Sequence, residues 1–300
     1  MQTHPIYRNS LTCAAMALAF TLAAHATSNQ TFISATGNDT NPCTSAQPCL
    51  TINHALTVTT VGGEIVVATS GTYAPATVDQ AVNITAPASV DASISVTTAG
   101  ENAITVNSTG NVSINGLTLR GHAAGGDGIL VTQVGVLRLI NMQIQNFTTN
   151  GVEFKSADSD MNVYSSNFLN NGNDGIRIDA AGAKAWVVGS SFDSNSNAGA
   201  DSGLGKMSIA DSNAHNNAVG FFANGGSITL YNTRAIFNTT GFKVSATGHL
   251  RFANCLLSDN TAAWDVVTGG VLSGSNPGTT LIAPGQTPNT GTMSAPVVLK

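Results

Sequence analysis

Hydrophobic and polar residues alternate in short runs along most of the chain, and several of these runs open with a glycine. The clearest are "GILV" at 128, "GVEF" at 151, "GIRI" at 175, "GFFA" at 220 and "GFKV" at 241. They start 23, 24, 45 and 21 residues apart, and Gly199 falls inside the interval of 45. Alternation with a period of two predicts half-buried β-strands, and no helical period interrupts the runs.

Asparagines mark the same period independently. Asn171, Asn195, Asn217, Asn238 and Asn260 follow one another at intervals of 24, 22, 21 and 22. A repeat of this length, made of short strands and turns, predicts a parallel β-helix whose successive coils stack about 4.8 Å apart. The asparagines would then form a ladder in which each side-chain amide bonds the coils above and below. Phe147 occupies the equivalent position one coil earlier, so the ladder is expected to begin at Asn171.

The same register predicts vertical columns of apolar side chains inside the coil. The four columns are Ile129, Val152, Ile176, Phe221 and Phe242; Val131, Phe154, Ile178, Ala223 and Val244; Leu139, Val163, Val187, Ile209, Leu230 and Phe252; and Ile144, Phe168 and Phe192. A slip of one residue would turn each column outward, so the register is strongly specified. The segment "AGADSGLGK" (198–206) departs from the pattern and is expected to project as a loop.

The two ends of the chain differ from the middle. Arg8 precedes the apolar stretch at 11–24, and "AHA" follows, which is typical of a signal peptide over residues 1–26. We therefore expect a secreted, periplasmic or cell-surface protein. We expect an N-terminal segment and cap at 27–60, the β-helix at 61–268 and a C-terminal tail at 269–300, with a final strand near 295–299.

Composition narrows the classes of partner. Only 9% of residues are charged, and a formal charge of −5 without a basic block gives no electrostatic footprint for nucleic acid. No run after the first 26 residues is long enough to span a membrane as a helix. We expect a single-domain monomer.

Cys43 and Cys49 are close enough in "PCTSAQPC" to form a disulfide that closes a small loop, and export would provide an oxidising environment. A metal site is disfavoured because it would need further ligands and no nearby His or Cys provides them, so no metal is assigned. Cys255 is expected to be a small buried residue.

The segment "SATGNDTNPCTSAQPCLTINHALTVTTVGGEIVVATSGTY" (34–73) resembles the opening of right-handed parallel β-helix proteins of the pectin-lyase-like group. The resemblance implies an all-β, single-stranded right-handed parallel β-helix whose N-terminal end is capped by a short helix, here "LTINHAL" (50–56). This group includes pectate lyases, polygalacturonases, epimerases and adhesins, so it implies a fold more than an activity. The polygalacturonase-like pattern is absent. Of its Arg-Ile-Lys element, "RID" (177–179) matches only the first two residues, and Asp179 replaces the lysine.

Charged residues gather around "FLNNGNDGIRID" (168–179). Glu153 is expected one coil from Arg177, and Lys155 one coil from Asp179, as outward-facing pairs of opposite charge worth about 0.2–1 kcal/mol each. The favoured interpretation of this cluster is structural.

A catalytic alternative uses Asp127 and Asp174, which would lie two coils apart in a column of turn residues with Asn150 between them. Two carboxyl groups about 9–10 Å apart fit an acid–base pair, with Arg177 as charge stabiliser. The chain would then be a polysaccharide lyase, glycoside hydrolase or epimerase acting on uronic-acid-type polymers. Only the lyase alternative would bring in a cofactor, calcium.

A binding surface is favoured over catalysis. Asn162, Tyr164 and Trp186 are predicted on the outer face of neighbouring coils, with both aromatic side chains exposed. A sugar ring can pack on an aromatic face while its hydroxyls bond an amide. The sequence thus predicts an exported β-helix that presents a rigid surface to a polysaccharide or a surface protein, with no assigned catalytic residue and no cofactor.

Overall fold

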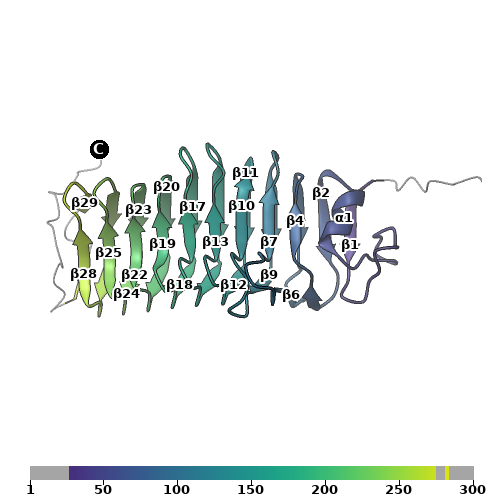
Figure 1. Cartoon of the computed structure of the whole chain (residues 1–300), viewed down its shortest axis with the longest axis horizontal. Coiled ribbons are helices and arrows are strands. Elements are labelled where there is room, and N and C mark those ends of the chain that lie inside the picture. The colour runs from purple at the N-terminus through teal and green to yellow at the C-terminus, as the bar shows by residue number, and fades with distance from the viewer. Residues whose placement is uncertain (1–26, 275–280, 284–300) are drawn as a thin grey trace, which may run out of the picture.

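The computed structural model describes residues 27–274 and 281–283. The predicted signal peptide at 1–26 and the predicted strand near 295–299 lie outside these residues. The described chain forms an elongated right-handed β-helix with three parallel sheets along its length (Figure 1). Among the described residues, no helix is both long and apolar enough to cross a membrane.

Each coil contributes one strand to each sheet. Sheet A contains β1 (Ser28–Ile33), β2 (Thr59–Val67), β5 (Val82–Thr85), β8 (Val112–Asn115), β11 (Val136–Ile140), β14 (Asp160–Tyr164), β17 (Lys184–Val188), β20 (Lys206–Ala210), β23 (Ser227–Tyr231), β26 (His249–Ala253) and β29 (Val271–Gly274). Sheet B contains β3 (Gly71–Tyr73), β6 (Ala92–Ser95), β9 (Leu117–Arg120), β12 (Gln143–Gln145), β15 (Asn167–Leu169), β18 (Ser191–Asp193), β21 (Asn213–His215), β24 (Arg234–Ile236), β27 (Leu256–Ser258) and β30 (Leu281–Ile282). Sheet C contains β4 (Ala76–Val78), β7 (Ile104–Asn107), β10 (Ile129–Gln133), β13 (Val152–Phe154), β16 (Ile176–Ile178), β19 (Ala198–Ser202), β22 (Val219–Ala223), β25 (Thr240–Val244) and β28 (Ala262–Val266).

The predicted inward columns are confirmed by the strand register. Ile129 pairs with Val152, and Val152 with Ile176, and all three are fully buried. In sheet B, the rings of Phe168 and Phe192 stack with centroids 5.2 Å apart. The core is therefore continuous from coil to coil along the solenoid.

The asparagine ladder is also confirmed, and it closes the turn between sheets B and C. Asn171 Nδ2 donates to Asn195 Oδ1 over 2.9 Å, and Asn195 Nδ2 donates to Asn217 Oδ1 over 3.0 Å. Each Oδ1 also accepts a backbone N–H from the preceding coil, and the first of these donors is Phe147. The ladder thus satisfies buried backbone groups that no strand partner reaches.

The segment 198–206 is not a projecting loop, so that prediction was wrong. Residues 198–202 form β19, which pairs with β16 on one side and β22 on the other. Ala200 takes the place that Ile176 and Phe221 occupy in the inward column. A small residue there weakens the hydrophobic signal without breaking the coil, and the rings of Phe192 and Phe221 meet edge to face with centroids 6.3 Å apart.

A short helix, α1 (Ile52–Val58), covers the N-terminal end of the solenoid (Figure 1). It begins two residues later than expected because Thr51 is its N-cap, accepting the N–H of His54. The Asp39 carboxylate holds the entry in place by accepting the N–H groups of Leu50 and Thr51. At the other end, β29 and β30 extend the parallel pairing beyond residue 268.

Candidate functional site

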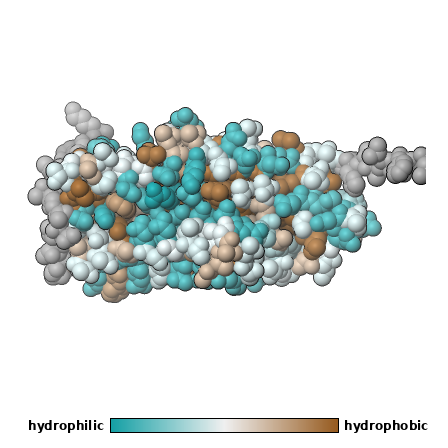
Figure 2. All heavy atoms as spheres, viewed as in Figure 1, coloured by the Kyte–Doolittle hydropathy of each residue, from teal (hydrophilic) through white to brown (hydrophobic). Residues whose placement is uncertain are grey.

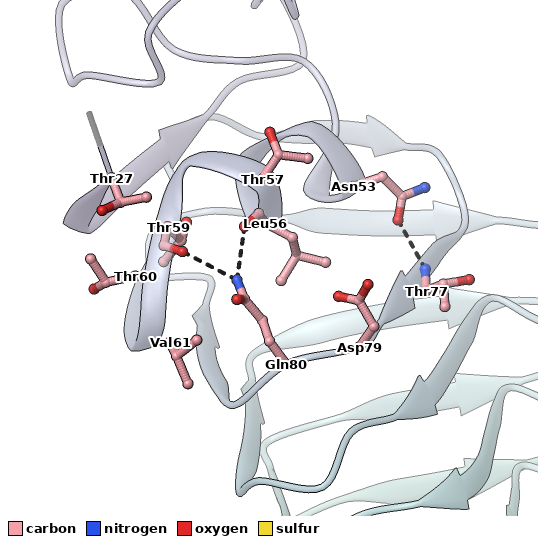
Figure 3. Close-up of a pocket in the computed structure, with 10 residues that line it drawn as sticks. All are labelled: Thr27, Asn53, Leu56, Thr57, Thr59, Thr60, Val61, Thr77, Asp79 and Gln80. Atoms are coloured by element: carbon pink, nitrogen blue, oxygen red, sulfur yellow. Dashed lines mark hydrogen bonds between the residues drawn. The ribbon is translucent and has the colours of Figure 1, made fainter. Parts of the chain in front are cut away.

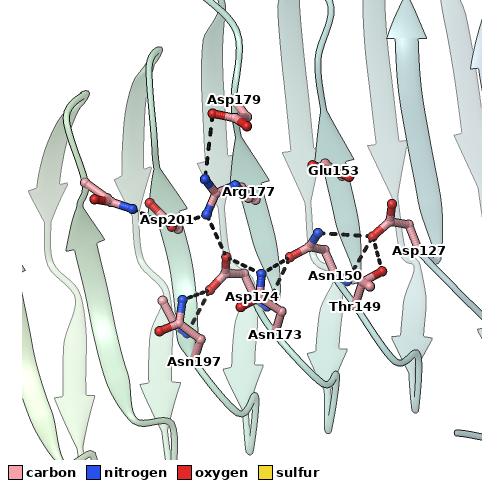
Figure 4. A network of polar contacts seen from close by, with 12 residues as sticks. Asp127, Thr149, Asn150, Glu153, Asn173, Asp174, Arg177, Asp179, Asn197 and Asp201 are labelled. Carbon is pink, nitrogen blue, oxygen red and sulfur yellow. Dashed lines mark hydrogen bonds and ion pairs between the residues drawn. The ribbon is translucent and has the colours of Figure 1, made fainter.

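A column of turn residues precedes the strands of sheet C, as predicted (Figure 4). Asp127 Oδ1 accepts the N–H of Asn150 over 2.9 Å, and Asn150 Oδ1 accepts the N–H of Asp174 over 3.2 Å. Asp174 Oδ1 accepts both the N–H of Ala198 and the amide of Asn197. Asp127 and Asp174 therefore each bind the next coil, forming a second polar ladder. They are separated by Asn150 and do not contact each other.

Arg177 lies at the centre of the charged cluster. Its guanidinium is 2.8 Å from Asp201, 3.6 Å from Asp174 and 3.7 Å from Asp179. Glu153 stands opposite Arg177 in the strand register, but its ion pair is with Lys155, at 2.8 Å on the same coil. The predicted pairing across coils, Glu153 with Arg177 and Lys155 with Asp179, was therefore wrong. The predicted register, with Glu153 opposite Arg177, is confirmed. The ion pairs differ from the prediction because Asp201 offers Arg177 a buried partner.

Asp201 is the residue of this cluster that the sequence reasoning missed. Its side chain is fully buried, Oδ2 accepts from Arg177, and Oδ1 has no hydrogen-bond partner among the described residues. Burial, together with the nearby charge of Asp174, raises the pKa of Asp201 to about 7. A signal was available, because Asp201 stands two residues after Gly199, just as Glu153 and Arg177 stand two after their own glycines.

The Asp201→Asn variant is expected to be more stable than the parent protein at neutral pH. The folded protein keeps the Asp201 proton up to about pH 7, whereas the unfolded chain releases it near 3.8. Stability from this group is therefore complete below pH 3.8 and falls as pH rises through 7, by about 1.4 kcal/mol per unit at most. Urea unfolding from pH 4 to pH 8 should show the two proteins diverging, with the variant ahead by on the order of 2 kcal/mol at pH 8. Parallel curves would contradict this assignment.

The central carboxyl groups of the cluster are closed off from solvent. Burial raises the pKa of Asp174 and also of Glu153. Raised pKa values are common in acid–base sites, but Asp174 and Asp201 have no exposed surface. Both carboxyl groups are within 4 Å of the Arg177 guanidinium. The geometry therefore favours a structural role for Asp127, Asp174 and Arg177. The face seen in Figure 2 carries hydrophilic side chains over its middle coils, with single apolar residues among them.

The outer face of sheet A carries the predicted aromatic strip. Arg138, Asn162 and Trp186 pair in register on β11, β14 and β17, and Tyr164 lies beside them, paired with Ile140 and Val188. Trp186 is 51% exposed, whereas Asn162 and Tyr164 are half-buried. The expectation that both aromatic rings are exposed thus holds for Trp186 only.

Positive charge flanks Trp186. Lys184 lies on the same strand and pairs in register with Lys206, and Arg138 lies two coils away in the Trp186 column. All three side chains are exposed. Asp160 pairs in register with Lys184, so it is the acidic residue in the column of Lys184 and Lys206.

Two adjoining hollows continue the strip toward the N-terminal end of sheet A. One, of about 490 Å³, is lined by residues that include Glu64, Asn83, Ser113 and Ile140. The other, of about 410 Å³, shares Asn83 and Ser113 and ends at Arg138. The groove thus follows the outward-facing column that leads to Asn162 and Trp186.

The predicted disulfide between Cys43 and Cys49 is present. The expectation that no His lies nearby was wrong, because α1 brings His54 within 4.8 Å of both sulfurs. The disulfide occupies both sulfurs, so this group is not a metal site in the oxidised protein. Cys255 is buried, as expected.

Comparison with curated proteins finds no match by sequence. Among solved structures, an alginate lyase from Paenibacillus sp. str. FPU-7 superposes with a TM-score of 0.70 at 16% identity, covering 90% of this chain and 100% of that one. The pectate lyase Pel9A gives 0.56 at 14% identity, with coverages of 84% and 79%. XylC, solved with xylose, gives 0.58 at 10% identity, with coverages of 85% and 70%. At these identities the likeness establishes the fold.

The sequence itself matches one family model, described as "Right handed beta helix region", over residues 127–282. The match covers more than half of the chain and includes the asparagine ladder, the charged cluster and the aromatic strip. The protein therefore belongs to the right-handed β-helix family.

Proposed function

We propose that this protein binds an acidic polysaccharide along the outer face of sheet A, with Trp186 as the platform for a sugar ring. The observation that carries the proposal is the exposure of Trp186, half of whose surface is open on a rigid sheet. An indole this exposed offers a flat apolar face, against which the C–H groups of a pyranose can pack.

The surroundings of Trp186 match an acidic sugar. Asn162, on the adjacent strand, offers an amide donor and acceptor for hydroxyl groups. Lys184, Lys206 and Arg138 supply positive charge for carboxylates, in a protein whose net charge is −5. The alginate lyase and the pectate lyase that share the fold are named for polymers of this class, which supports the choice.

Binding is favoured over catalysis because the charged cluster on sheet C is buried and internally paired. A carbohydrate-active enzyme is the second candidate, because Arg177 gathers the carboxyl groups of Asp174, Asp179 and Asp201, and because the alginate lyase and the pectate lyase share the fold. We also propose export, because the Cys43–Cys49 disulfide is typical of oxidising compartments.

Truncation of Trp186 is expected to weaken polysaccharide binding at least about tenfold, equivalent to about 1.4 kcal/mol. The experiment measures both retention and cleavage of pectate, alginate and xylan by the purified protein and by its Trp186→Ala variant. Phe237→Ala is the matched control, because Phe237 is an aromatic residue, 61% exposed, in the turn after β24 of sheet B. Equal losses in both variants, or retention untouched by Trp186→Ala, would overturn the proposal. Cleavage that Asp201→Asn abolishes would favour the enzyme.

A further inference from the structure

The groove on sheet A leads into a larger pocket beneath α1, which we call the cap pocket (Figure 3). It has a volume of about 680 Å³ and is lined by Thr27, Asn53, Leu56, Thr57, Thr59, Thr60, Val61, Thr77, Asp79 and Gln80. Thr60 and Val61 line both this pocket and the 490 Å³ hollow next to it. The three hollows therefore form one path from the cap to Arg138.

The cap pocket is rich in hydrogen-bonding groups held in fixed positions. Gln80 Nε2 donates to the carbonyls of Leu56 and Thr59, so its Oε1 stays available as an acceptor. Asn53 Oδ1 accepts the N–H of Thr77. The exposed Asp79 carboxylate, which has no bond to another described residue, adds charged acceptors on the same side (Figure 3).

This set of groups selects for hydroxyl donors and against carboxylates. None of the ten lining residues is Lys, Arg or His, and Asp79 would repel an acidic sugar. Glu64, at the same end of the groove, adds a second negative charge. Positive charge is found instead at the other end, around Arg138, Lys184 and Lys206.

The distance between the two ends fits a short oligosaccharide. Glu64, Asn83, Ser113, Arg138, Asn162 and Trp186 form one outward column across six neighbouring strands. Five steps of about 4.8 Å span roughly 24 Å, the length of about five sugar units in an extended chain. A trisaccharide seated on Trp186 is shorter than this span, whereas a hexasaccharide is long enough to cover it and extend past Glu64, which lines the hollow that adjoins the cap pocket.

We propose that the cap pocket is a terminal subsite for an uncharged, hydroxyl-bearing sugar unit, belonging to the same oligosaccharide whose acidic units lie at Trp186. The inference rests on the proposed function and specifies its ligand as a chain with acidic units at one end and a neutral unit at the other. Asp79 and the Gln80 Oε1 bind the hydroxyls of the neutral unit, and Val61, which is 75% exposed, forms the apolar side of the passage.

The test uses trimers and hexamers prepared from pectate and from alginate, each in the ionised form and in a partly methyl-esterified form that contains neutral units. Titration calorimetry on the parent protein should give tighter binding to the esterified hexamer than to the ionised hexamer or to either trimer. Asp79→Ala should weaken binding of the esterified hexamer about tenfold, since charged acceptors form strong hydrogen bonds, and should leave the trimers unchanged. Asp91→Ala is the matched control, because Asp91 is an exposed carboxylate next to β6 on sheet B.

The outcomes separate the two proposals. Binding that depends on Trp186 but shows no preference for the hexamer, or no response to Asp79→Ala, overturns the cap subsite and leaves the sheet A site in place. A hexamer that is bound more tightly when fully ionised also overturns it. Absence of binding to every oligomer overturns both proposals.

Discussion

Replacing Arg177 with Met should lower the free energy of unfolding by about 3–5 kcal/mol at pH 7, the range observed when one partner of a buried ion pair is removed. Arg177 is the only cation within 4 Å of Asp201 and Asp174 among the described residues, and both carboxylates are fully buried. Without the guanidinium, each carboxylate must stay charged and unpaired or take up a proton. The loss should therefore be clearly smaller at pH 4.5, where protonation costs less.

Urea unfolding at the two pH values measures both effects. Arg234→Met is the matched control, because Arg234 is exposed on β24 and has no ion pair among the described residues; it should change stability by less than about 0.5 kcal/mol. An Arg177→Met loss that matches the control, or one that does not shrink at pH 4.5, would show that the cluster is not held by this ion pair.

Replacing Asn195 with Ala should cost about 2–4 kcal/mol, because it leaves several buried polar groups without partners. Asn195 Oδ1 accepts two bonds from Asn171, and its Nδ2 donates to the Phe168 carbonyl and to Asn217. The side chain is 1% exposed, so water does not replace these bonds. Thermal and urea unfolding report the loss.

Asn167→Ala is the control for the ladder, since Asn167 is exposed on β15 and forms no side-chain bond to another described residue. The free energies of unfolding of the two variants should differ by at least about 1.5 kcal/mol. Similar stabilities would mean that the stacking of the coils does not depend on the asparagine ladder.

The fold could be predicted from the sequence because a solenoid repeats its information. Glycines, asparagines and apolar residues each gave the same spacing, so an error in one landmark was corrected by the others. The structure differs from the prediction where a residue interrupts its column. Ala200 puts a small residue in an inward column, so the segment 198–206 departs from the repeat and predicts a projecting loop instead of β19, which carries Asp201.

The candidate site could be predicted only in part, for a related reason. Trp186 was placed on the outer face by strand alternation, which needs no knowledge of the neighbouring coils. The degree of exposure of Tyr164 depends on how the flanking side chains pack, and strand alternation does not predict that packing. The cap pocket and the position of His54 depend on α1 and on the chain before β2, which lie outside the repeat and have no column to align with.

The most direct test of polysaccharide binding on sheet A is the behaviour of the two tryptophan indole N–H signals in an NMR titration with pectate and alginate oligosaccharides. The chain contains two tryptophans, of which Trp186 is 51% exposed on sheet A and Trp264 lies half-buried on β28, packed against the core. A Trp186→Phe variant assigns the two signals. Polysaccharide binding on sheet A predicts that the Trp186 signal shifts in a saturable manner while the Trp264 signal stays in place. A saturable ligand that leaves the Trp186 signal unmoved would contradict it.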